Sequence, residues 1–162
     1  MSITAEGIIC LSNGPGERTR GNLEACIDQF VDQFKGDWQP HDGLTFCNIA
    51  AQAITAALQC PLPVELANLQ IAWLGSEAGR LAGWAETTRA DAIAHAESGG
   101  PVVVGWYNAH GPHGHIAVLR PVPVGDDPAR APFIAQAGRE TFWCGTLQRG
   151  FGNLPVRFWR HT

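Results

Sequence analysis

Residues 101–119 read PVVVGWYNAHGPHGHIAVL, and this stretch decides the class of fold. Short apolar runs bounded by glycine and proline predict buried strands over 101–107 and 115–119. The connecting segment Asn108–Gly114 is rich in glycine, proline and histidine. Because so short a connection joins antiparallel strands most simply, we expect a β-hairpin here.

Further extended runs follow at 132–137 and 155–159, whereas the chain before Gly100 has helical spacing. Helices are predicted over Asn22–Phe34 with Asn22 as cap, over Phe46–Leu58 with Thr45 as cap, and over 64–74 and 89–97. Helices followed by antiparallel strands predict an α+β fold, with one antiparallel sheet packed on one side against N-terminal helices. No linker or repeat divides the chain, so residues 1–162 are expected to form a single domain.

The composition excludes several classes of partner. Charged residues make up 16% of the chain, well below the usual value of about 25%. The net charge is −4 and no basic block is present, so we expect no nucleic acid partner. No apolar run approaches the roughly 18 residues of a membrane span, so no membrane insertion is expected.

The cysteines point to a thiol nucleophile rather than to a disulfide framework. Five cysteines with no CxxC pair argue against both a disulfide scaffold and a zinc finger; they are Cys10, Cys26, Cys47, Cys60 and Cys144. Cys47 opens the helix predicted over Phe46–Leu58, where unpaired N–H groups and the helix dipole stabilise a thiolate. The alternative for Cys47 is a small buried apolar side chain. Cys10, Cys26 and Cys60 are interpreted as structural, and the sequence leaves their pairing and that of Cys144 open.

A base and an orienting group occur on the strands that follow. His115 begins an apolar run directly after Gly114, a position that suits a general base. The alternative is a surface histidine at the end of a strand. Gln136 lies among apolar residues in the run 132–137, and a buried amide needs a hydrogen-bond partner, which an imidazole would supply. The alternative for Gln136 is the solvent face of an edge strand.

The cluster of His110, His113 and His115 raises a metal site as a further alternative, since imidazoles bind zinc and copper. Two of the three fall in an irregular loop, and no second group of ligands accompanies them. We therefore expect neither a metal nor a cofactor.

The order of cysteine, histidine and polar residue resembles the papain-like fold in the circularly permuted form of the NlpC/P60 and CHAP amidases of bacterial cell walls. The matching stretches are TFCNIAAQ (45–52), VVVGW (102–106) with GHIAVL (114–119), and FIAQAG (133–138). The resemblance covers about residues 37–160. Within this group the chain is most similar to short amidase effectors of type VI secretion and to phage-type wall amidases.

The resemblance implies that Cys47 is the nucleophile, His115 the base and Gln136 the third residue. Neutral glutamine departs from the His, Asn or Glu of many relatives, and the Tyr-x-Trp-Gly-Gly stretch common among them is missing. The backbone N–H of Cys47 would contribute to an oxyanion hole, with a second donor from the preceding loop. Candidates for that donor and for the cleft wall are His41, Trp38, Trp106 and His113.

The function this implies is hydrolysis of an amide bond in peptidoglycan stem peptides, with no cofactor. The alternatives are a papain-like deamidase, acyltransferase or protease acting on a protein, and a non-catalytic module that binds a metal or a partner. The N-terminus lacks a signal peptide. We therefore expect synthesis in the cytoplasm and action in the periplasm or cell wall after non-Sec delivery or lysis. An injected toxin would need an immunity protein in its producer.

Overall fold

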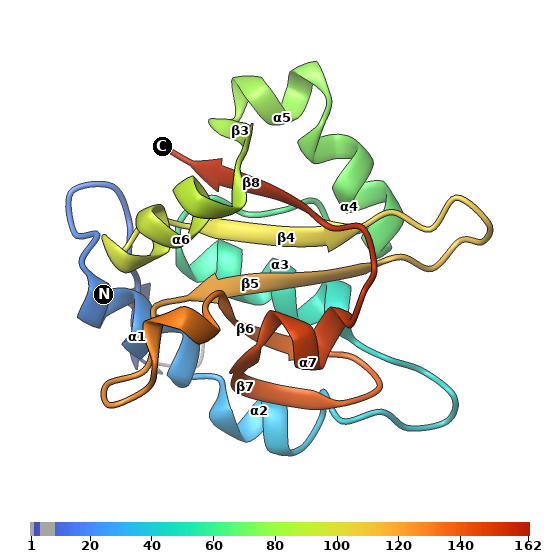
Figure 1. The fold of residues 1–162 in the computed structure, drawn as a ribbon, viewed down its shortest axis with the longest axis horizontal. Helices are drawn as coiled ribbons and strands as arrows, with labels where there is room; N and C mark the ends of the chain where they lie inside the picture. The colour runs from blue at the N-terminus through green and yellow to red at the C-terminus, as the bar shows by residue number, and fades with distance from the viewer. Residues whose placement is uncertain (1, 4–8) are drawn as a thin grey trace.

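The structure, a computed structural model, describes residues 2–3 and 9–162 (Figure 1). Its main sheet has six antiparallel strands in the order β3-β8-β4-β5-β6-β7, and the short strands β1 (Ser2–Ile3) and β2 (Ile9–Cys10) form a separate pair. The α+β class and the antiparallel sheet are thus confirmed. Among the described residues, every helix is too short or too polar to cross a bilayer.

The strands of the main sheet are β3 (Trp84–Thr87), β4 (Val102–Trp106), β5 (His115–Arg120), β6 (Phe133–Ala137), β7 (Thr141–Thr146) and β8 (Arg157–His161). Four of the six, β4, β5, β6 and β8, follow the apolar runs of the sequence. The expected hairpin is confirmed, with Trp106 opposite His115 in the β4–β5 pair. The strand predicted over 155–159 begins two residues later, because Pro155 has no N–H to donate to the sheet. Neither β3 nor β7 was predicted.

The helices agree with the sequence in part. They are α1 (Arg20–Asp28), α2 (Val31–Lys35), α3 (Cys47–Ala57), α4 (Ala67–Leu74), α5 (Glu77–Leu81), α6 (Arg89–Glu97), α7 (Leu147–Phe151) and the 3-10 turn η1 (Pro128–Arg130). The predictions over 46–58 and 89–97 are confirmed as α3 and α6. The helix predicted over 64–74 begins three residues late, at Ala67.

Two predicted helix caps are wrong. The helix expected over Asn22–Phe34 is two helices, and Thr19 caps the first by accepting a hydrogen bond from the Asn22 N–H. Asn22 therefore lies inside the helix. Thr45 does not cap α3; the residue before that helix is Phe46, which makes no side-chain cap bond. The first N–H groups of α3 are consequently left for other acceptors.

Helices cover both faces of the sheet, so the prediction that they pack on one side is wrong. On one face, Arg120 of β5 pairs with Asp28 of α1 at 2.7 Å, and a Cβ on Gly105 would lie 2.8 Å from Ile71 of α4. The helix α3 lies on this face, behind the sheet in Figure 1, and α6 and α7 lie in front. The strand β6 shows why, since it is buried at every position. A strand whose residues do not alternate between apolar and polar needs apolar cover on both faces.

Candidate active site

Cys47 is the first residue of α3, and its side chain is almost completely buried. Its sulfur lies at the backbone N–H of Ile116 in β5 and at the first N–H groups of its own helix. These N–H groups favour the thiolate, but burial opposes it more strongly and raises the pKa of the Cys47 thiol. The lowered pKa that the helix start predicts is therefore wrong for this state of the protein.

The other described thiols differ in burial. Cys60 is buried, which raises its pKa to about 12, and the half-buried Cys144 in β7 also has a raised pKa from burial. The side chain of Cys10 lies outside the described residues.

His115 and Gln136 form the central contact of the site. The Nε2 atom of His115 is 2.8 Å from Oε1 of Gln136. The amide nitrogen of Gln136 donates to the carbonyl oxygen of Glu140, also at 2.8 Å. Because that nitrogen is committed, the amide oxygen faces the ring, and Nε2 of His115 must carry the hydrogen. Nδ1 of the neutral imidazole is then the unprotonated nitrogen that a base needs.

Burial lowers the pKa of His115 below its ordinary value near 6.5, and the Gln136 hydrogen bond opposes this shift. The imidazole is therefore neutral at neutral pH. Together with the raised pKa of Cys47, this describes a neutral thiol and a neutral imidazole rather than an ion pair.

Helix α7 encloses the His115–Gln136 contact. The Phe151 ring lies 4.5 Å from the His115 ring, centroid to centroid. A Cβ at Gly150 would overlap Oε1 of Gln136, and a Cβ at Gly138 would lie 3.0 Å from Cε1 of His115. Both positions therefore favour glycine. Sequence reasoning quoted Gly138 only as part of the segment 133–138 and missed Gly150 and Phe151, which no local pattern marks as neighbours of His115.

The thiol and the imidazole meet β5 at adjacent residues. The thiol lies at the N–H of Ile116 on the α3 side, whereas the His115 ring packs against α7. No hydrogen bond joins these two described side chains.

The two candidate oxyanion donors differ in their surroundings. Trp38 is buried and packs edge-on against Phe34 of α2, with ring centroids 4.8 Å apart. His41 is exposed, and its ring lies 4.8 Å from that of Phe46, the residue before Cys47. The structure thus brings the His41 ring against the residue that precedes the thiol.

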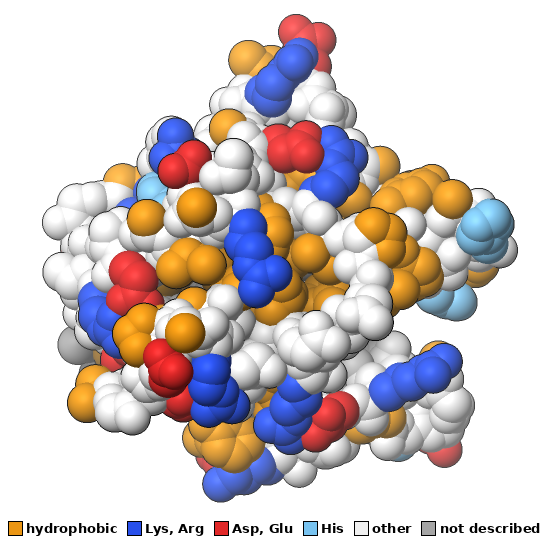
Figure 2. All heavy atoms as spheres, viewed as in Figure 1, with side chains coloured by type: hydrophobic (Ala, Val, Ile, Leu, Met, Phe, Trp, Pro, Cys, Tyr) orange, Lys and Arg blue, Asp and Glu red, His pale blue; other side chains and the backbone are white. Residues whose placement is uncertain are grey.

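The remaining candidates lie along the β4–β5 hairpin. Trp106 is opposite His115, so both side chains lie on the same face of the sheet. His113 and His110 are exposed in the hairpin loop. Figure 2 shows a recess between this hairpin, marked by pale-blue histidines, and the lobe below it. Within residues 2–3 and 9–162, no three His, Cys, Asp or Glu side chains are grouped to hold a metal ion.

Two buried polar side chains of α4 were also missed. Asn68 accepts from the Asn108 N–H at 2.8 Å and donates to the carbonyl of Gly111 at 2.9 Å, which fixes the hairpin to α4. Gln70 donates to the carbonyl oxygen of Asn48, in the first turn of α3, at 3.2 Å. The signal was an amide inside an apolar helical pattern, which marks a residue that must find a partner.

No model of a known protein family matches the chain, and no curated protein matches it. The chemistry must therefore be read from the site. A buried thiol at a helix start, an imidazole with a fixed tautomer and an amide that orients it are the parts of a nucleophile–base–orienter arrangement.

Proposed function

We propose that this chain is a papain-like cysteine amidohydrolase that cleaves an amide bond in peptidoglycan stem peptides. The observation that supports the reaction type is the His115–Gln136 contact of 2.8 Å, which orients a neutral imidazole at the strand residue next to the one that the Cys47 thiol touches. The substrate class is supported by the resemblance of three sequence segments to NlpC/P60 and CHAP amidases.

In this mechanism, Nδ1 of His115 takes the proton of the Cys47 thiol as the sulfur attacks the carbonyl carbon of the amide. The backbone N–H of Cys47 and the ring of His41 stabilise the oxyanion that forms. His115 then gives its proton to the leaving amine nitrogen, and the C–N bond breaks to leave a thioester. Water, deprotonated by His115, cleaves the thioester and restores the thiol.

Gln136 positions the base without changing its charge. A neutral amide cannot stabilise an imidazolium as a carboxylate does, so the resting pair stays neutral. Proton transfer accordingly accompanies the attack, with no stored thiolate. This predicts slow alkylation of Cys47 at neutral pH compared with enzymes that hold a thiolate–imidazolium pair.

The proposed substrate lies outside the cytoplasm, so the protein would act in the periplasm or cell wall after non-Sec delivery or lysis. A producing cell would then need an immunity protein against its own toxin.

Digestion of purified sacculi tests this function. We expect released stem-peptide fragments, and mass spectrometry of the fragments identifies the amide bond that was cut. A denatured casein sample treated in parallel separates a wall amidase from a papain-like protease. If casein is cleaved and the sacculi stay intact, the substrate is a protein and not peptidoglycan. If neither is cleaved, the proposal that the chain is a hydrolase is contradicted.

A further inference from the structure

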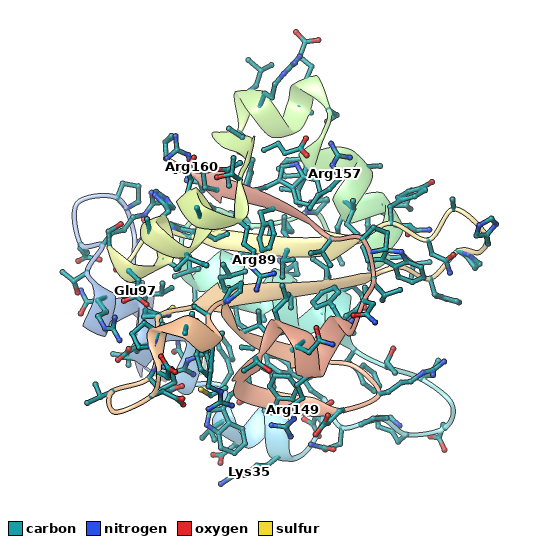
Figure 3. The ribbon with its side chains drawn as sticks, viewed as in Figure 1. Lys35, Arg89, Glu97, Arg149, Arg157 and Arg160 are labelled. Atoms are coloured by element: carbon teal, nitrogen blue, oxygen red, sulfur yellow. The ribbon has the colours of Figure 1, made fainter. Side chains whose placement is uncertain are left out.

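A second hollow, lined by arginines and apolar side chains, lies on the α6–α7 face of the sheet. It has a volume of about 110 Å³ and does not include Cys47 or His115. Arg89 and Arg130 line it, together with apolar side chains from α7 and from the segment before β8, among them Leu147, Phe151 and Leu154. Figure 3 shows Arg89 extending from α6 across the sheet toward α7.

The charge in this hollow is not balanced. Its lining includes two arginines and no acidic residue. The guanidinium of Arg89 donates to the carbonyl oxygen of Ala131 at 3.2 Å, and no carboxylate of the described residues lies within ion-pair distance of it.

The neighbouring arginines differ in this respect. Arg149 is paired with Glu140, and Arg157 with Glu86. Arg130 shares its charge with Asp126, which is 2.7 Å away. Arg89 therefore keeps most of its five donors for a ligand.

We propose that this hollow binds a small carboxylate with a short aliphatic body. A planar guanidinium matches a carboxylate with two parallel hydrogen bonds, and Arg89 with Arg130 supplies two such groups in the lining. Leu147, Phe151 and Leu154 supply the apolar wall for the aliphatic part. The small volume of about 110 Å³ limits the ligand to a few carbon atoms.

The hollow and the proposed catalytic pair share one wall. Phe151 lines the hollow and also packs on the imidazole of His115. The binding proposal does not depend on hydrolase activity, because it rests on the charge and shape of the hollow. The same chemistry occurs in a free organic acid and in the C-terminus of a short peptide, so the test includes both.

The experiment is an NMR titration of the full chain with isobutyrate, with N-acetylalanine as the peptide-terminus probe and isobutyramide as the neutral control. We expect saturable shifts of the backbone signals of 147–152 with at least one of the two carboxylates and none with isobutyramide. Arg89→Gln should weaken binding about tenfold or more, because a charge-assisted pair is lost. Arg80→Gln, an exposed arginine of α5 outside the hollow, should leave the affinity unchanged.

A second variant moves the affinity in the opposite direction. Asp126→Asn removes the carboxylate that competes for Arg130 and should tighten binding about threefold. A loss of fold cannot imitate such a gain. The proposal is overturned if neither carboxylate gives a saturable shift, if isobutyramide binds as tightly, or if Arg89→Gln keeps the wild-type affinity.

Discussion

The two faces of β5 contribute to the proposed site in different ways. On the α3 face, Cys47 is the end of a helix held by apolar packing, and its sulfur meets backbone N–H groups alone. On the α7 face, the orientation of the His115 ring is set by one hydrogen bond to the amide of Gln136. That amide is held by the carbonyl oxygen of Glu140 and fits only because Gly150 has no side chain. The nucleophile is thus positioned by many weak contacts, and the base by a few specific ones. The first arrangement should tolerate neighbouring substitutions that the second does not.

The largest effect is expected on the α3 face, from removing the nucleophile. Cys47→Ala should lower fragment release from sacculi by about 10⁴-fold or more. The fold should persist, because one sulfur is removed at the start of a helix whose packing remains, and circular dichroism checks this. Cys144→Ala, a half-buried cysteine in β7, is the matched control and should keep activity. Full activity in Cys47→Ala would rule out the cysteine-hydrolase mechanism.

On the α7 face, Gly150→Ala should act through Gln136. The added methyl group overlaps Oε1 of Gln136, which must then move away from His115. A displacement of this order costs about 10²-fold in rate, and we expect it in kcat with little change in KM. Gly21→Ala in α1, where a Cβ meets nothing within 4 Å, is the control for a glycine change in a helix. Wild-type kcat in Gly150→Ala would show that the Gln136 contact is dispensable.

A smaller and more specific effect is expected on the pH profile. The base must be neutral, and burial holds the pKa of His115 below 6.5, so the acid limb of kcat/KM should lie below that pH. Gln136→Glu places a carboxylate beside the ring, raises its pKa and should move the limb upward by about one unit.

Gln136→Ala should move the limb in the other direction, because it removes the hydrogen bond that raises the pKa of His115. Acid limbs that coincide in the wild type and both variants would mean that another group is the base.

The smallest effect is expected from the hairpin loop that joins β4 to β5. His113 is exposed and outside the His115–Gln136 contact, so His113→Ala should change fragment release by about threefold at most. EDTA should leave the wild-type rate unchanged, because both nitrogens of His115 have roles other than metal binding in this mechanism. Strong inhibition by EDTA, with equal losses from His110→Ala and His113→Ala, would favour a metal site in the loop.

The helices and strands that could be predicted are those whose hydrophobic pattern is contained in consecutive residues. The helix around Ala50 and Ile54 and the strand around Val103 have enough consecutive apolar residues at one period to be recognised. β7 was missed because its composition is mixed, and α7 because it is only five residues long. Thr146 caps α7 by accepting a hydrogen bond from the Arg149 N–H, and the core holds Leu147 and Phe151, so this helix exists mainly through tertiary contacts.

The candidate site shows the same division. The chain alone determines that a cysteine starts a helix, that a histidine starts a strand and that a glutamine lies on the next strand, since each follows from neighbouring residues. The tautomer of His115, the direction of the Cys47 pKa shift and the packing of Phe151 on the imidazole depend on residues far apart in the chain. Burial and orientation arise from packing between distant segments, and no local pattern records which face of a sheet a later helix will cover.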